Sequence, residues 1–549
     1  MPTAYFSVLQ NPSRRKKLLI AAILVLWLVT LWRAISILAP GTIYVIYNSD
    51  GAIPILMANE QRPITVFDHY YYAAGRWGGW PMITARLINH STGYRWTPKS
   101  FHAIRAVWLF IGILVLALLN PRNALFVVLI GLSLICLDSN LRLRLFDPGQ
   151  VYAWQITALL LAWYSLRRLF GEDLGSSSGK KLLLKRILWG VLLFWFSFLS
   201  IWSSFASGPF LCFLVVLETA WSRLSSGKAP VRSWRTKRYI WGLALVGAAI
   251  LLEILMRRNY HRHGLKHYGH TFETSLFLDI GYLGKHLEML LATLPDFSLW
   301  PLLPLMLIVV IAVVGSLVYF KLKRREDRLA KLRKLLLEET VVLIVGTFGI
   351  AAFNFVLMVM VNHVRVNDYD NRFMTLTFLF GGVSGLLTLY LLIRALLTKA
   401  KIARYGMPAL MFAVFLFLLV AFPRWRENDL YRVEQETAHV LANRVPHAFL
   451  IGGYWATYVF PPFLPTDKLI PLPREGELVR MPWTIKMLSG EKFVLLEYRQ
   501  SNSAPYTRNP ALFTPPEELI QYGNTLRLVE PKFYENGPFG FALYVNTTN

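Results

Sequence analysis

Long runs of apolar residues recur along most of the chain. A helix that crosses a bilayer needs roughly 20 consecutive apolar residues. Eleven runs approach this length, and they lie at 18–38, 101–119, 123–138, 149–167, 187–204, 207–222, 239–256, 300–320, 340–361, 373–395 and 406–423. The pattern predicts a polytopic α-helical membrane protein with about eleven transmembrane helices. Two runs, 123–138 and 207–222, are short, so the parity of the number depends on them.

The last part of the chain follows a different pattern. Its apolar stretches are short or alternate with polar residues, as in HAFLIGGYW, KFVLLEYR and FGFALYV, and Pro and Gly separate them. Such stretches are typical of strands in a soluble domain. We therefore expect a transmembrane module at 1–423, with long outer loops at 40–100 and 257–299. A C-terminal soluble domain of α/β or mixed type is expected at 424–549.

Composition and charge agree with a membrane protein. Hydrophobic residues make up 55% of the chain and charged residues 16%, which is more apolar surface than one soluble core of this size could bury. The formal net charge of +26 would suit a protein that binds nucleic acid. However, Lys and Arg occur in short blocks between the apolar runs, as in loops beside lipid headgroups. Membrane lipid, and not nucleic acid, is therefore the expected partner of these blocks.

The positions of the basic blocks predict the orientation of the chain. They lie at 14–17, 167–186, 223–238, 321–334 and 394–404. With eleven crossings and a cytoplasmic N-terminus, all five blocks fall on the cytoplasmic side, where Lys and Arg accumulate. The C-terminal domain then lies outside, whereas an even number of crossings would place it inside. A bacterial inner (plasma) membrane with a periplasmic or extracellular C-terminal domain is the expected location.

The first outer loop concentrates polar residues that could carry chemistry. Asp50 lies in the turn Asn48-Ser49-Asp50-Gly51, and Asp68-His69 precedes an aromatic, glycine-rich stretch that contains Arg76. Structural explanations exist for both, since the turn could be a helix cap and the aromatic residues a belt at the membrane surface. Two acids, a histidine and an arginine in one loop beside the membrane nevertheless favour a functional site.

The chain resembles the GT-C superfamily of membrane glycosyltransferases in its general architecture and in four short motifs. The motifs are Asp50 in NSDGA, Asp68 in FDHYYYAAGRWGGWP, Asp147 in LFDPGQVYAW and Arg372 in NDYDNRFM. The resemblance implies a GT-C-like helix bundle, a first outer loop with horizontal helices and an essential acid, and an outer C-terminal domain. It also implies a polyprenyl-phosphate sugar donor, and hexosyl or pentosyl transfer to a glycan, lipid or protein acceptor on the outer face.

The resemblance and the chemistry together suggest roles for individual residues. Asp50 matches the first-loop acid and is expected to act as general base, because the acceptor hydroxyl loses its proton as it attacks the anomeric carbon. Arg372 precedes a late helix and suits the charge that grows on the leaving lipid phosphate. Further substrate-binding candidates, each with headgroup contact or a structural role as its alternative, are Asp68, His69, Arg76, Asp147, Arg258 and His363.

These motifs fix neither the metal requirement nor the exact reaction. Some GT-C enzymes use a divalent cation such as Mg²⁺ or Mn²⁺, and Asp50, Asp68 and Asp147 could supply oxygen ligands, whereas other members need no metal. One alternative function is a glycan ligase or polymerase with a lipid-diphosphate donor, although such proteins usually carry their large loop between late helices. Another is a lipid or glycan flippase, for which no internal repeat is visible.

Overall fold

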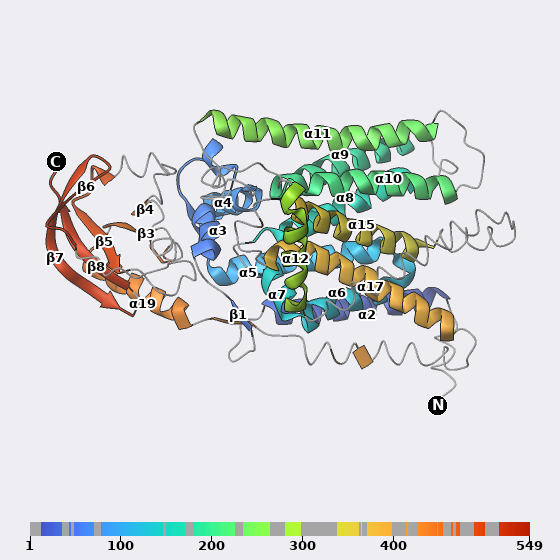
Figure 1. Cartoon of the computed structure of the whole chain (residues 1–549), viewed down its shortest axis with the longest axis horizontal. Coiled ribbons are helices and arrows are strands. Elements are labelled where there is room, and N and C mark those ends of the chain that lie inside the picture. The colour runs from blue at the N-terminus through green and yellow to red at the C-terminus, as the bar shows by residue number, and fades with distance from the viewer. Residues whose placement is uncertain are drawn as a thin grey trace.

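A helical bundle and a smaller domain of strands make up the chain, which is seen here in a computed structural model (Figure 1). The structure describes residues 12–35, 43–45, 49–70, 78–146, 150–171, 179–225, 234–263, 280–297, 338–361, 364, 371–397, 413–414, 417, 425–427, 429–446, 448–453, 460, 463–464, 468–472, 488–499, 515–537 and 539–548.

Nine of the predicted apolar runs coincide with helices. These helices are α2 (Pro12–Ile35), α5 (Pro98–Leu118), α6 (Ala124–Leu137), α8 (Tyr152–Gly171), α9 (Gly179–Ser203), α10 (Ser207–Ser225), α11 (Trp234–Arg262), α15 (Glu339–Met360) and α17 (Thr375–Leu397). The run at 300–320 lies outside the described residues, and only three residues of the run at 406–423 lie within them.

Five helices in the described part of the chain are long and apolar enough to cross a membrane, or six if α6 and α7 (Ser139–Phe146) form one bent span. The expected number of about eleven is therefore not confirmed, whereas apolar helices followed by a C-terminal sheet domain are present. The outer helices suit lipid, because α9 and α11 expose large apolar side chains such as Leu184, Val191 and Trp241.

Local signals explain where several helices begin, end and bend. Thr97 caps α5 by accepting a hydrogen bond from the backbone N–H of Ser100, and Pro98 occupies the first turn. Asp138 ends α6, and its side chain accepts from the N–H of Leu141 at 2.9 Å. The chain then turns by 98° into α7. Arg142 of α7 donates to the carbonyl oxygen of Cys136 at 2.8 Å, which satisfies one of the last carbonyls of α6.

The two ends of the bundle differ in character. The N-terminal ends of α2, α9 and α11 and the C-terminal ends of α8, α10 and α17 lie at the end remote from the strand domain (Figure 1). Four of the five basic blocks flank these positions. The remaining block, 321–334, lies outside the described residues. Sorting of these four to one end agrees with the predicted sidedness, although the orientation in a cell remains a prediction.

The first loop occupies the other end of the bundle, between the long helices and the strand domain (Figure 1). Its elements are β1 (Ile43–Val45), α3 (Ser49–Asn59), η1 (Val66–Asp68) and α4 (Trp80–Thr92). Residues 51–60 are all buried, so α3 is a core helix of this end from its third residue onward. By contrast, α4 alternates buried and exposed positions, and it ends at Gly93 in the left-handed conformation.

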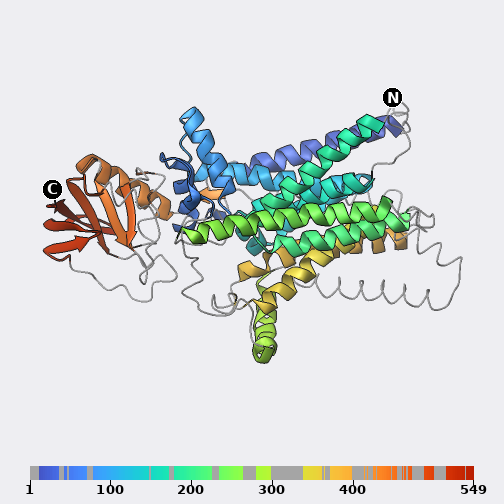
Figure 2. The same ribbon diagram turned by 90° about the horizontal axis from the view of Figure 1, so that it is seen from above.

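Short elements complete this end of the bundle. They are η4 (Ile280–Tyr282), α12 (Leu283–Ala292), η5 (Leu294–Asp296) and η6 (Asn371–Met374), while η2 (Pro121–Asn123) lies between α5 and α6. Figure 2 shows α12 projecting from the bundle, across the direction of the long helices. Phe297 stacks on Phe378 of α17 with ring centroids 3.7 Å apart, which fixes the segment after α12.

The C-terminal domain is a mixed sheet with one helix. Its elements are α19 (Asp429–Arg444), β3 (Phe449–Gly453), β4 (Leu469–Leu472), β5 (Phe493–Arg499), β6 (Glu518–Gln521), β7 (Asn524–Asn536) and β8 (Phe539–Asn546). The strand order is β4-β3-β5-β8-β7-β6, with β3 parallel to β4 and β5 and the other pairs antiparallel. Arg444 at the end of α19 donates to the carbonyl oxygen of Phe533 at 2.7 Å, so the helix is fixed on the sheet.

Two contacts join this domain to the first loop. The strand β2 (Trp425–Glu427), which precedes α19, pairs in parallel with β1, so that Ile43 lies opposite Trp425 and Val45 opposite Glu427. In addition, Arg95, between α4 and α5, donates to the carbonyl oxygen of Leu464 at 3.2 Å. The first loop is therefore held between the bundle and the strand domain.

Candidate functional site

The first loop closes on itself at the base of the stretch that contains Arg76. Tyr70 and Gly78 form an antiparallel bridge, and the N–H of Gly79 donates to the carbonyl oxygen of His69 at 2.8 Å. A Cβ atom on Gly78 would lie 2.2 Å from the carbonyl oxygen of Trp202, so a larger residue would collide with backbone. Arg76 itself, between the two bridge residues, lies outside the described residues.

Two acids and two arginines form a buried cluster beside this base, which we call the loop charge cluster: Glu60, Arg62, Asp68 and Arg86. Nη2 of Arg86 lies 2.8 Å from Oε2 of Glu60 and 2.8 Å from Oδ1 of Asp68. Nη2 of Arg62 lies 3.1 Å from the same oxygen of Glu60 and 2.8 Å from that of Asp68. The formal charges cancel, which lets four ionised side chains remain out of water.

Both carboxylate oxygens of Asp68 accept hydrogen bonds from other groups of the protein. The carboxylate is fully buried and accepts hydrogen bonds from both arginines of the cluster. It also accepts from the backbone N–H of Thr65 at 2.8 Å, which completes a capping box around η1. In this geometry Asp68 fixes η1 against α4. Its predicted contact with substrate stays a prediction.

His69 faces a different environment from its neighbour. Its ring is half-buried and lies edge-on to the indole of Trp202 of α9, with centroids 6.4 Å apart. Burial lowers the pKa of His69 below its usual value, and the nearby Asp68 carboxylate opposes this effect. Among the described residues no hydrogen-bond partner faces its buried Nδ1. The lowered pKa favours the neutral imidazole, in which one ring nitrogen is a donor and the other an acceptor.

Asp50 is the second residue of α3. Its side chain lies outside the described residues, but its place in the helix has two consequences. A negative charge in the first turn is stabilised by the helix N-terminus, which favours the ionised carboxylate. Pro54, four residues later, has no N–H and cannot donate to the carbonyl of Asp50. The first turn of α3 therefore has fewer internal hydrogen bonds than an ordinary helix start.

Arg372 lies in η6, immediately before α17. Its guanidinium is half-buried and lies over the ring of Phe373, 5.1 Å from the centroid. The hydroxyl of Tyr152 at the start of α8 donates to the carbonyl oxygen of Arg372, and Nδ2 of Asn354 in α15 donates to that of Phe373 at 3.2 Å. The arginine therefore sits on backbone fixed by two helices. Asp147, five residues before Tyr152, lies outside the described residues.

Two buried basic residues of α5, not anticipated from the sequence, support this region. Arg105 is fully buried and donates to the carbonyl oxygen of Gln150, just before α8. His102, one turn earlier, contacts the carbonyl oxygen of Ala34 in α2 through Nε2 at 3.1 Å, and its ring packs on Phe146. Both residues belong to the apolar run at 101–119. Ionisable residues three apart in a transmembrane run were the signal that could have revealed them.

Two further candidates are Arg258 and His363. Arg258 is exposed near the end of α11, and His363 lies outside the described residues. No group of three or more His, Cys, Asp or Glu side chains that could hold a metal ion occurs in the described parts of the chain. Because the side chains of Asp50 and Asp147 are not among them, the metal site that the three aspartates could form is not tested.

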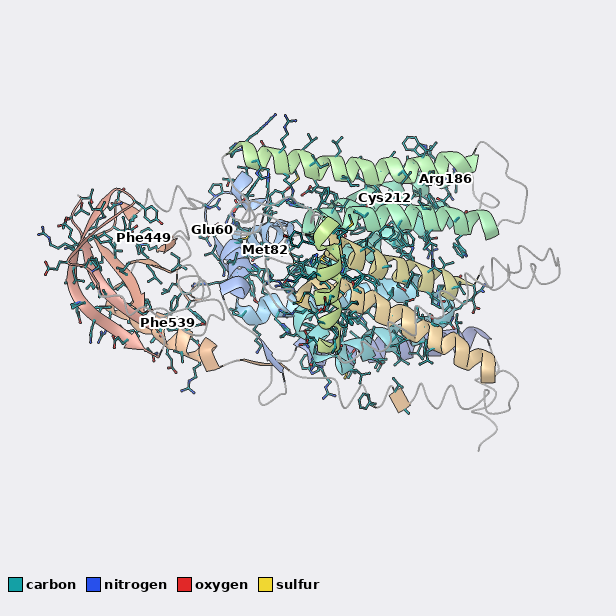
Figure 3. The ribbon with its side chains drawn as sticks, in the orientation of Figure 1. Glu60, Met82, Arg186, Cys212, Phe449 and Phe539 are labelled. Carbon is teal, nitrogen blue, oxygen red and sulfur yellow. The ribbon has the colours of Figure 1, made fainter. Side chains whose placement is uncertain are left out.

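The candidate residues that are described gather at one end of the bundle. Figure 3 shows Glu60 and Met82 at the end that faces the strand domain, and Arg186 toward the opposite end. The helices α3 and α4 of the first loop and the start of α17, which η6 directly precedes, belong to the former end (Figure 1). Fold and site together define a bundle of apolar helices with buried polar and charged side chains at the end that faces the strand domain.

Solved structures with a similar fold include two membrane-associated transferases. One is the archaeal oligosaccharyltransferase AglB from Archaeoglobus fulgidus, in complex with an inhibitory peptide and a dolichol-phosphate. It is 12% identical, with a TM-score of 0.43, and the match covers 88% of this chain and 70% of that one. The other is ArnT from Cupriavidus metallidurans bound to undecaprenyl phosphate. It is 13% identical, with a TM-score of 0.41, and the match covers 98% of this chain and 99% of that one.

Both are GT-C glycosyltransferases, the superfamily that the sequence motifs resemble. No protein-family model matches the chain, and no curated protein matches it.

Proposed function

We propose that the chain is a membrane glycosyltransferase that moves a sugar from a polyprenyl-phosphate donor to a glycan, lipid or protein acceptor. The acceptor oxygen forms a bond to the anomeric carbon as the bond from that carbon to the phosphate oxygen breaks. The lipid phosphate leaves with the electron pair, and the hydroxyl proton passes to a carboxylate. The reaction occurs at the end of the bundle that faces the strand domain.

The observation that carries this proposal is the fixed cation at the start of α17. Arg372 lies on backbone held by Tyr152 and Asn354, directly before α17, whose first turn is at the same end of the bundle as α3 (Figure 1). A guanidinium can contact two phosphate oxygens at once, and its preorganisation means that little reorganisation is needed when charge develops on the leaving group. An amphiphilic donor would place its phosphate at this depth, with its tail among the apolar helices.

Asp50 is the proposed general base. Its place in the first turn of α3 favours the ionised form that can accept a proton. His69, as a neutral imidazole beside the loop base, is proposed to contact the sugar or acceptor, together with Arg76, Asp147, Arg258 and His363. Asp68 contributes by holding η1 in place. If a divalent cation is required, Asp50 and Asp147 are its proposed ligands.

Substitution of Asp50 tests the proposal in the purified full-length protein reconstituted in nanodiscs. Labelled sugars on polyprenyl phosphate are supplied, and formation of a glycosidic bond is measured. Asp50→Asn is expected to lower kcat about 100-fold or more, because general-base assistance contributes about 10²–10⁴. Asp138→Asn is the matched control, since asparagine preserves its capping of Leu141 at the same end of the bundle.

Three outcomes would overturn parts of the proposal. Full activity of Asp50→Asn excludes Asp50 as the base. Transfer from a lipid-diphosphate donor alone would identify a ligase or polymerase. Movement of lipid across proteoliposomes without any glycosidic bond would identify a flippase.

A further inference from the structure

A buried carboxylate lies in a helix that faces lipid. Glu253 of α11 is fully buried, although its neighbours Leu251 and Leu255 are more than half exposed. An acid in a transmembrane helix is unfavourable unless it is paired. Oε1 of Glu253 accepts from Nε and Nη2 of Arg257, one turn later, at 2.9 and 2.6 Å.

This ion pair reaches the first loop through Tyr70. The hydroxyl of Tyr70 donates to Oε1 of Glu253 at 3.3 Å, and the guanidinium of Arg257 lies 5.0 Å from the centre of its ring. Tyr260 packs edge-on against the same ring at 4.9 Å. Burial, followed by the charge of Glu253, raises the pKa of Tyr70 well above its usual value, so its hydroxyl remains a donor. Residues 253, 257 and 260 lie on one face of α11 and together hold one side chain.

Tyr70 is also the residue at which the first loop closes. It bridges to Gly78, and the adjacent His69 carbonyl accepts from Gly79. Helix α9 also holds this base, because Nε1 of Trp202 donates to the His69 carbonyl at 2.7 Å. Nε1 of Trp80 donates to Oγ of Ser203, also at 2.7 Å. The base of the loop is thus fastened to two transmembrane helices.

We infer that Glu253 and Arg257 are positioning residues, which hold Tyr70 and thereby fix the base of the first loop and the imidazole of His69 for the reaction. This inference rests on the proposed glycosyl transfer. Neither residue touches the reacting groups in this assignment, since both act through Tyr70. The alternative is that the pair only neutralises a buried charge within α11.

The chain contains a matched control for that alternative. Glu218 of α10 is also buried, and its Oε1 accepts from Nε1 of Trp163 at 2.6 Å and from Nε of Arg167 at 2.9 Å. Both partners belong to α8, toward the end of the bundle remote from the first loop. Glu218→Gln therefore perturbs a buried glutamate–arginine pair of the same chemistry away from the proposed site.

The test compares Tyr70→Phe, Glu253→Gln and Glu218→Gln in the full-length protein in nanodiscs. Hydrogen exchange is measured on peptides containing Gly79, together with melting temperature, kcat and KM. Tyr70→Phe removes only the hydroxyl, so it keeps the assay informative if Glu253→Gln does not fold. Tyr94→Phe, an exposed tyrosine of the same loop, controls for the substitution itself.

Tyr70→Phe and Glu253→Gln are expected to speed exchange at Gly79 about 10-fold and to lower kcat by a similar factor, since a hydrogen bond to a charged group is lost. Glu218→Gln and Tyr94→Phe are expected to leave both quantities at wild-type values. Unchanged exchange in Tyr70→Phe, or equal effects of Glu253→Gln and Glu218→Gln, would overturn the inference. If the wild-type protein transfers no sugar, the proposed function fails while the exchange result still decides whether α11 fastens the loop.

Discussion

At the scale of single residues, charge burial dominates the first loop. Asp68 and Glu60 are both fully buried, yet each lies within 3.1 Å of two arginines. Such a cluster contributes little net free energy while it is complete, because desolvation offsets the attraction. Removing one of the four side chains lowers stability strongly, because the remaining charges stay buried without their partner. The cluster therefore makes the conformation of the loop depend on every one of its members.

Arg86→Met is expected to destabilise the protein by about 3–5 kcal/mol, because it leaves two buried carboxylates to share Arg62. The melting temperature in nanodiscs should fall by several degrees. Arg168→Met is the control, since Arg168 is exposed and its guanidinium donates to the hydroxyl of Tyr164, one turn earlier in the same helix. A loss of stability no larger than that of the control would contradict a structural role for the cluster.

His69 gives the loop a dependence on pH. Because burial lowers its pKa in the folded protein, the unfolded chain binds a proton more readily as the pH falls below about 6.5. Stability that is present above this pH is therefore lost on acidification. Between pH 8 and pH 5, the melting temperature of His69→Asn should fall less than that of the wild-type protein. A constant difference between the two proteins across this range would show that His69 does not contribute.

At the scale of elements, close contact of the loop base with α9 limits the residues that it can contain. A Cβ atom on Gly78 would meet the carbonyl oxygen of Trp202 at 2.2 Å, and one on Gly79 would meet that of Asp68 at 2.1 Å. Backbone atoms cannot rotate away as side chains can. The glycines of this stretch therefore allow the loop to pack on the helix.

Gly78→Ala is expected to lower stability by about 1–3 kcal/mol, because the loop base must move away from α9. Sugar transfer should fall with it if the loop carries substrate contacts. Gly247→Ala in α11 is the control, and it is expected to raise stability. Nothing lies within 4 Å of its added methyl group, and alanine favours a helix over glycine by about 0.5–1 kcal/mol. The melting temperatures of both variants measure the effect. Equal stability of Gly78→Ala and Gly247→Ala would contradict the close contact between Gly78 and Trp202.

Hydropathy predicted the elements better than it predicted their contacts. Nine runs became helices, because a long apolar segment has one stable form in lipid. The burial of α3 was not foreseen, since its apolar residues suited an interfacial helix equally well. Arg86 and Glu60 could not be paired from sequence, because their contact depends on how α4 folds back over α3. Arg105 was overlooked inside an apolar run, although its charge was visible.

At the scale of the whole molecule, the strand domain contains an unusual acid. Glu434 of α19 is fully buried, and within the described part of the chain neither of its oxygens has a hydrogen-bond partner. Burial raises its pKa well above the usual value for a carboxyl. The unfolded domain therefore releases this proton more readily. Glu434 costs stability at pH values above the ordinary carboxyl pKa, and the cost shrinks as the pH falls toward it.

Glu434→Gln is expected to raise the melting temperature by about 2–4 °C at neutral pH and by less at pH 5. Glu436→Gln is the matched control on the same helix, because Glu436 is exposed and its bridge to Arg432 contributes at most about 1 kcal/mol. A melting temperature of Glu434→Gln equal to that of the wild-type protein at both pH values would contradict a cost of burying Glu434.

The pairing of β1 with β2 also has a consequence for the order of events during synthesis. Residue 43 emerges from the ribosome early, whereas its partner, residue 425, follows only after the last apolar run. Since domains generally fold as they are made, the bundle can form while β1 still has an open edge. The strand β1, which leads into Asp50, therefore pairs with β2 only after the apolar helices have been made. A nascent chain halted before residue 425 therefore has its scaffold in the membrane but an unfinished first loop.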